Sequence, residues 1–179
     1  MPLDMRERIR RAIVRGFEAR SAYYNAIHLP DEQRLGLPAT EAQLVRLETF
    51  TSRRLPNSYR TFLSLHDGWR MGVDGATDLL STEEMLTGPR AASIREWKRK
   101  ELDAGGLVGS NSLVIGMSNI TPTKLLLDPE RTGANGEWAV VQYHHEEEGD
   151  YPSFLIWLED SIIEFQELLR EEREGSSEG

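Results

Sequence analysis

The apolar residues of this chain change their spacing twice, and the order of these changes limits the folds that the chain can adopt. Up to about residue 66 they recur every three or four positions, which is typical of helices that pack on one side. Between about 113 and 144 they form short runs bounded by turn-forming residues, which is typical of strands. From residue 154 the helical spacing returns, and the apolar stripes predict that one core buries Tyr59, Phe62, Leu63, Trp157 and Phe165. Helices, then antiparallel strands, then a helix predict an α+β fold and not a βαβ succession.

Local signals place the expected elements along the chain. Thr40 and Gln43 have the spacing of a capping box, Gly68 can end a helix in the left-handed conformation, and Asp128-Pro129 should end a strand. The expected helices are 4–27, 41–53, 56–66, a short helix after Ser81, 89–103 and 153–170. The expected strands are 69–73, 78–80, 113–117, 124–127 and 137–144, followed by a polar loop at 145–150.

Length and composition exclude several kinds of chemical site and indicate where in the cell the protein is found. The 179 residues suit one domain, and the lack of cysteine excludes disulfides, thiolate metal sites and cysteine nucleophiles. Charges interrupt the first fifteen residues, so they do not form the apolar core of a signal peptide, and no apolar run is long enough to span a membrane. We therefore expect a cytoplasmic protein with no membrane partner.

The net charge of −9 is concentrated near the C-terminus. Residues 137–179 hold 2 basic and 13 acidic residues, a net charge of −11, whereas residues 1–60 carry a net charge of +4. An acidic third of the chain repels nucleic acid and would attract a basic protein. The same charges could also serve only to keep the surface soluble, and charge alone does not decide between these interpretations.

No motif of a familiar catalytic or nucleotide-binding site is present. The sequence has no P-loop, no dinucleotide-binding glycine pattern, no nucleophile elbow and no zincin helix. No pair of carboxylates lies in an apolar setting that would raise a pKa for acid–base catalysis. We therefore predict no enzymatic activity and no cofactor. A hydrolase or metal enzyme that uses His144 and the neighbouring acids remains an alternative.

The most suggestive cluster of polar residues is Tyr143 to Asp150, which places two histidines beside four acids. Such a set could bind a divalent metal, or it could be a solvated acidic loop. Adjacent histidines on a strand point to opposite faces and do not chelate one ion together without a bend. The sequence therefore predicts no metal site here.

Four tryptophans are candidates for the core or for a binding surface. Trp97 and Trp157 lie on apolar helical stripes, which indicates core packing. Trp69 follows a turn glycine and Trp138 lies near the start of a strand, positions at which partial exposure is plausible. Because exposed tryptophan is enriched at binding hot spots, we predict that these two contribute to an interface.

Several short motifs, taken in order, resemble the domains of the SUKH superfamily. The part of this chain that resembles the opening of such a domain is Leu37-Pro38-Ala39-Thr40, then Leu55-Pro56-Asn57-Ser58-Tyr59-Arg60-Thr61-Phe62-Leu63, then Asp67-Gly68-Trp69. Asp78-Leu79-Leu80-Ser81-Thr82-Glu83-Glu84 looks like the segment after the first strands. Gly136-Glu137-Trp138 and Tyr151-Pro152-Ser153-Phe154 look like the closing pattern of its bacterial branch. The resemblance covers about residues 37–170.

This superfamily includes fungal regulators of cell-wall synthesis and many bacterial toxin-immunity proteins. The resemblance implies a central, mostly antiparallel sheet flanked by helices, no enzymatic activity and, in bacterial members, a groove adapted to one toxin. Residues 1–36 match nothing in the family, and we interpret them as an added helical extension that packs on the domain or reaches a partner. Residues 171–179 are expected to be a flexible acidic tail.

These observations favour an immunity protein that sterically blocks a cognate bacterial toxin made by a secretion-linked polymorphic toxin system. The toxin is expected to be basic, with a nuclease as the favoured class, because nucleases bind phosphates. The alternative is a non-catalytic regulatory or scaffold module. The residues predicted to bind the partner are Asp67, Trp69, Trp138, Tyr143, His144, Glu146, Glu147, Glu148 and Asp150.

Overall fold

The computed structural model describes residues 4–71, 77–105, 111–144 and 146–175, and it confirms the α+β class. Its helices are α1 Met5–Ala26, α2 Glu41–Thr51, α3 Asn57–Leu65, α4 Thr82–Leu86, α5 Gly88–Asp103 and α6 Phe154–Gly175. Its strands are β1 Arg34–Leu35, β2 Trp69–Arg70, β3 Thr77–Leu79, β4 Leu113–Ser118, β5 Lys124–Thr132, β6 Trp138–His144 and β7 Glu146–Tyr151. The capping box expected at Thr40–Gln43 forms, and a second capping box, Ser81–Glu84, begins α4.

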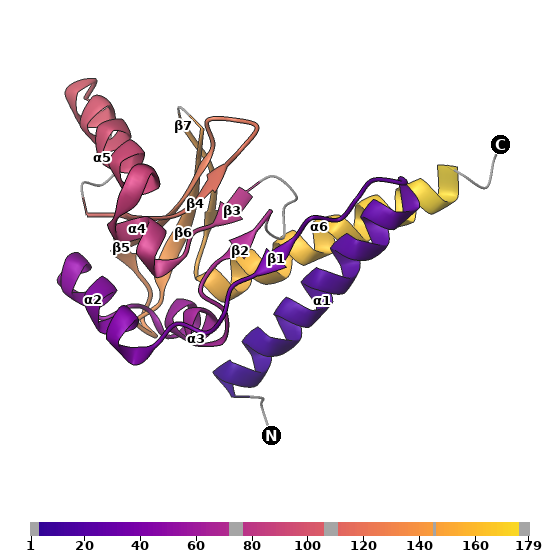
Figure 1. Ribbon diagram of the computed structural model, residues 1–179, viewed down its shortest axis with the longest axis horizontal. Coiled ribbons are helices and arrows are strands. Elements are labelled where there is room, and N and C mark those ends of the chain that lie inside the picture. The colour runs from indigo at the N-terminus through magenta and orange to yellow at the C-terminus, as the bar shows by residue number, and fades with distance from the viewer. Residues whose placement is uncertain (1–3, 72–76, 106–110, 145, 176–179) are drawn as a thin grey trace.

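The described strands form one antiparallel sheet in which every strand pairs with its neighbours along the chain, in the order β1 to β7 (Figure 1). Successive side chains of a strand point to opposite faces of a sheet. Val140 and Val141 are both buried, and so are Leu125, Leu126 and Leu127. Both faces are therefore covered here, which confirms the expected central sheet flanked by helices.

Aromatic rings join α3 to the start of α6 at the centre of the core. Phe62 lies 5.0 Å from Phe154 between ring centroids, Tyr59 lies 5.1 Å from Phe154, and Phe154 lies 5.5 Å from Trp157. The five residues predicted to be buried are all buried: Tyr59, Phe62, Leu63, Trp157 and Phe165. Phe165 lies farther along α6, where it packs edge-on against Tyr23 of α1.

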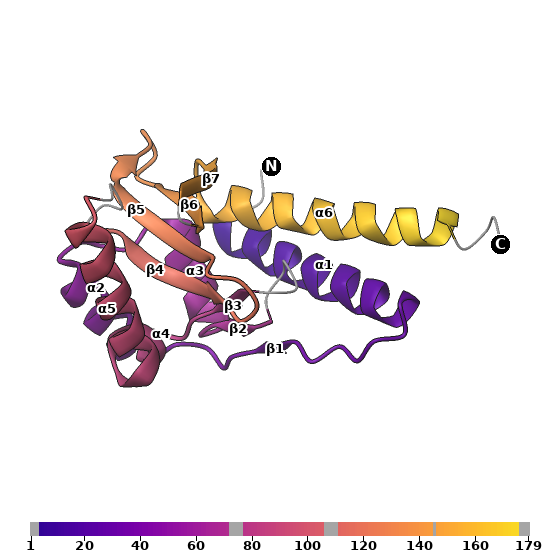
Figure 2. The ribbon, with the colours of Figure 1, turned by 90° about the horizontal axis from the view of Figure 1, so that it is seen from above.

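Helices α1 and α6 run side by side in the same direction, away from the sheet (Figures 1 and 2). Near their starts Arg8 pairs with Glu159 at 3.4 Å, and farther out Tyr23 meets Phe165 at 5.8 Å. After α1 the chain turns back along this pair and adds β1 to the edge of the sheet next to β2 (Figure 2). The added N-terminal helix thus packs on the domain, against its last helix.

The predicted exposure of Trp69 and Trp138 is wrong, because both side chains are buried, with exposed fractions of 0% and 4%. The added helix and its return segment cover Trp69. Its indole Nε1 donates a hydrogen bond to Gln33 at 3.2 Å, and its ring stacks on Phe17 of α1 at 6.5 Å. Trp138 starts β6 and belongs to the main core.

The main differences from the sequence expectation lie in β1, β5, β7 and α6, and β1 was not expected at all. Strand β5 continues past Pro129, which lies where the register with β6 shifts between Asp128 and Thr132, so that the missing N–H breaks no ladder. Residues 146–150, expected in a loop, belong to β7, because their backbone pairs with β6. Helix α6 continues to Gly175, beyond its expected end near residue 170.

Candidate functional site

The residues predicted to bind a partner fall in two separate parts of the fold. Asp67 and Trp69 lie where α3 leads into β2. The others lie on β6 and β7, where Tyr143, His144, Glu146, Glu147 and Asp150 are partly or fully exposed. Glu148 also belongs to β7, although its side chain lies outside the described part of the structure, as does all of His145.

The Asp67 carboxylate is occupied within the fold. It accepts hydrogen bonds from the backbone N–H of Thr82 at 2.7 Å, from the Thr82 hydroxyl at 2.9 Å and from Gln43 at 3.4 Å. Because Thr82 is the first residue of α4, Asp67 satisfies a helix N-terminus and ties α2 and α4 to the end of α3. The motif residues Asp67 and Trp69 therefore hold the fold together.

A second contact between motifs has the same role. The buried Glu137 carboxylate accepts hydrogen bonds from the backbone N–H of Ser58 at 3.0 Å and from the Ser58 hydroxyl. Ser58 lies in the first turn of α3, so a carboxylate here also complements the helix dipole. The Leu55–Leu63 and Gly136–Trp138 motifs thus meet in the core, where no partner can reach them.

Changing Glu137 to glutamine should destabilise the protein by about 2–3 kcal/mol, because it replaces two charge-assisted hydrogen bonds to Ser58 by neutral ones and removes the negative charge at the start of α3. Urea unfolding followed by circular dichroism measures this loss. Glu130→Gln is the matched control, since Glu130 makes only exposed contacts with Arg53 and Asn111. Equal losses for the two variants would show that the Ser58–Glu137 contact does not stabilise the fold.

The acids of β7 form a charged network with Arg131 of β5. The Arg131 guanidinium makes two 2.7 Å hydrogen bonds to Glu147, and it pairs at 3.3 Å with both Asp150 and Asp128. The hydrogen bonds from Arg131 lower the pKa of Glu147 below its usual value, and Glu147 raises the pKa of Arg131 in turn. One cation faces three carboxylates, so this surface remains acidic.

A half-buried aromatic cluster borders this network. The Tyr143 hydroxyl donates a 2.7 Å hydrogen bond to Glu101 of α5, and its ring packs edge-on against Trp97 at 5.7 Å. Burial, followed by the contact with Glu101, raises the pKa of Tyr143 to about 12. The ammonium of Lys124 lies 4.9 Å from the Trp97 ring centre, and burial lowers its pKa. His144 contacts Thr123 through Nδ1 at 3.2 Å.

We call Tyr143, His144, Glu146, Glu147 and Asp150, together with Arg131, the β6–β7 surface. Tyr143 lies opposite Glu147, His144 opposite Glu146, and Val141 opposite Asp150. Reading the sequence alone missed Arg131, Trp97, Glu101 and Lys124. Arg131 is the one basic residue in the turn-rich segment 128–136 and could have been noticed, but no signal linked Trp97 or Glu101 on α5 to Tyr143.

Strand β7 is an edge strand, the last in the order of the described sheet. Charged side chains on an edge strand discourage other strands from pairing with it, so the acids also protect the fold from aggregation. Among the described residues no group of three or more His, Asp or Glu side chains could hold a metal ion. The arrangement suits recognition of a positively charged surface.

Two comparisons add to this geometry. The family model described as SMI1 / KNR4 family (SUKH-1) matches residues 38–167. This range contains the whole β6–β7 surface and both motif contacts, and it excludes α1 and β1. No curated protein matches the sequence. In the part of the chain that the structure describes, no helix is both long and apolar enough to cross a bilayer.

Proposed function

This chain belongs to the SMI1/KNR4 family (SUKH-1), and from that premise we propose that it is an immunity protein that binds a cognate bacterial toxin and blocks it sterically. Membership supports a role in toxin immunity or a related protein interaction, and members of this family are generally not catalytic. The proposed toxin, its basic character and the cytoplasmic site of action go beyond membership.

The observation that carries the proposal is the β6–β7 surface. Its acids lie on strands whose backbones pair with β6 or β5 in the sheet. This pairing fixes the positions of their backbones in the free protein. Preorganised charge lowers the cost of binding and steers an oppositely charged protein toward the surface. A nuclease is the favoured target class, because an enzyme that binds phosphates carries a basic surface.

Steric occlusion fits the same surface. In the described structure its charges contact each other and neighbouring side chains, and no group of three or more His, Asp or Glu residues among them could hold a metal ion. A protein that covers the basic substrate-binding surface of a nuclease excludes the nucleic acid by occupying the same place. We propose that inhibition requires binding alone and no chemical change in the toxin.

Co-expression with the toxin encoded beside it is the direct test. We expect this protein to restore growth of cells that produce that toxin, to leave growth unprotected against toxins from other loci, and to bind the purified toxin in a stable complex. Protection without a detectable complex would contradict occlusion. A complex without protection would favour a regulatory or scaffold module.

A further inference from the structure

The described sheet has two edge strands, and they differ in length and in charge. Figure 2 shows β1 at one end of the row of strands and β7 at the other. Strand β1 has two residues, and its Arg34 lies opposite Arg70 of β2. Strand β7 has six residues, Glu146–Tyr151, and all of its charged residues are acidic. Of the two edges, β7 is therefore the longer one and the one that attracts basic side chains.

The backbone of β7 is paired on one side. Its residues pair with β6 in antiparallel register, and among the residues that the structure describes no backbone hydrogen bond joins β7 to any other element. In an antiparallel pair, alternate residues direct their N–H and C=O groups away from the neighbouring strand. On an edge strand these groups form a row with which a further strand can pair. Strand β7 therefore offers main-chain donors and acceptors on its outer side.

Two acids of β7 share one face of the sheet. The register places Glu147 opposite Tyr143 of β6. It places Asp150 opposite Val141, because the register shifts between these two pairs. Tyr143 and Val141 are two positions apart, and alternate residues of a strand point to the same face. Glu147 and Asp150 therefore lie on one face, where the guanidinium of Arg131 contacts both of them.

The opposite face of this edge is acidic as well. Glu146 pairs with His144, whose side chain points away from the first face. Tyr151 lies on the same face as Glu146, and there α6 brings two more acids near the end of β7. Burial, followed by the negative charges of Glu164 and Asp160, raises the pKa of Tyr151. Negative charge therefore borders the β7 edge on both faces of the sheet.

We propose that β7 binds a strand of the partner protein, which pairs with its backbone and carries lysine or arginine at alternate positions. The backbone hydrogen bonds join the two chains, and the basic side chains meet Glu147 and Asp150 across the new pair of strands. The acids that discourage pairing with most strands then select a basic one. This inference rests on the proposed function, which supplies a basic toxin as the partner.

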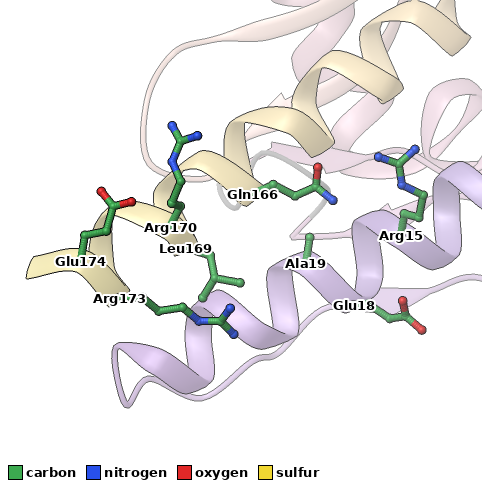
Figure 3. Close-up of a pocket in the computed structure, with 8 residues that line it drawn as sticks. All are labelled: Arg15, Glu18, Ala19, Gln166, Leu169, Arg170, Arg173 and Glu174. Atoms are coloured by element: carbon green, nitrogen blue, oxygen red, sulfur yellow. The ribbon is translucent and has the colours of Figure 1, made fainter. Parts of the chain in front are cut away.

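Neither a second copy of the chain nor the largest concavity suits this role. A second copy that paired its own β7 with this one would place carboxylates against carboxylates, and like charges directly opposite each other destabilise a sheet. A concavity of about 750 Å³ lies between α1 and α6, and Figure 3 shows three arginines, Arg15, Arg170 and Arg173, beside two glutamates in its lining. Its excess of positive charge repels a basic segment.

Hydrogen exchange of the full-length protein tests the strand site with three synthetic peptides of about ten residues, long enough for one strand. The basic peptide has lysine at alternate positions with threonine between, and the acidic peptide has glutamate in place of lysine. The third is the basic peptide N-methylated throughout, which keeps the charge but cannot donate to a backbone carbonyl. The basic peptide should slow exchange of the β7 amides and bind at least about tenfold more tightly than the other two.

Charge reversal on β7 makes the peptide test specific. The variant E147K/D150K should prefer the acidic peptide to the basic one by about tenfold, since both cross-strand pairs change sign. The control E18K/E32K changes the net charge equally at exposed positions outside β7 and should keep the wild-type preference. Equal binding of the basic peptide and its N-methylated form overturns strand addition, and so does an unchanged preference in E147K/D150K.

The toxin encoded beside this protein gives the second test, and it separates the strand site from the proposed function. In a complex with that toxin, exchange of the β7 amides should slow at least about tenfold, as expected for backbone groups that become paired. A protective complex in which the β7 amides exchange as in the free protein overturns the strand site and leaves the immunity function in place. If the basic peptide slows β7 exchange but no toxin complex forms, the immunity function is wrong and the strand site stands.

Discussion

Replacing Phe62 by alanine is expected to lower the free energy of unfolding by about 3–5 kcal/mol, the usual cost of truncating a buried phenylalanine. Phe62 is fully buried, and its ring lies 5.0 Å from Phe154 and 6.2 Å from Tyr59. The substitution opens a cavity between α3 and α6 that neither helix can close, because both are also held against the sheet. Urea unfolding monitored by circular dichroism measures the change.

Phe50→Ala is the matched control for this prediction. It is the same substitution in the neighbouring helix α2, at a side chain that is 57% exposed, and it should change stability by less than about 1 kcal/mol. A loss below about 1 kcal/mol for Phe62→Ala would mean that the aromatic cluster does not form the centre of the core.

Neutralising the β6–β7 surface should slow association with the toxin at least about tenfold at low salt, the lower end of what electrostatic steering contributes. The variant combines Glu146→Gln, Glu147→Gln and Asp150→Asn, which removes three negative charges and leaves Arg131 with Asp128 as its remaining partner among these acids. Because these side chains are exposed and their desolvation is costly, we expect them at the rim of the interface, so that dissociation changes little. Binding kinetics at two salt concentrations separate the two rates.

The control removes three carboxylates elsewhere, through Glu32→Gln, Glu41→Gln and Glu83→Gln, all of them exposed. Its net charge equals that of the test variant, so a difference between the two reports position and not total charge. If dissociation accelerates instead, the surface is a desolvated centre of the interface. If neither rate changes at either salt concentration, the toxin binds another part of the molecule.

Sequence patterns predicted the helices well because their boundaries are local. Thr40 with Gln43 and Ser81 with Glu84 define helix starts within four residues, and both capping boxes form. The apolar stripe of α3 likewise identified Tyr59, Phe62 and Leu63 as core residues, since its pattern needs one helix face alone. Strands β4, β5 and β6 were likewise expected from short apolar runs bounded by turn-forming residues.

Features that depend on distant residues were not predictable in this way. Trp69 is buried because α1 and Gln33 cover it, and nothing near Trp69 in the sequence shows this. The acids of β7 have low strand propensity, yet backbone pairing with β6 makes them a strand, so tertiary context overrides the local preference. For the same reason the β6–β7 surface could be anticipated from Tyr143, His144 and the acids, whereas the contacts of Tyr143 with Trp97 and Glu101 could not.

The parallel packing of α1 on α6 also governs when the N-terminal part of the protein can finish folding. A ribosome adds roughly 5–20 residues per second, so on the order of ten seconds separate the synthesis of α1 from that of α6. Through this interval α1 can reach α3 and Trp69 but lacks its contacts with α6, and a helix without its full packing is only marginally stable in water. The N-terminal extension is therefore made first but can complete its packing only after α6, at the end of the family domain, has emerged.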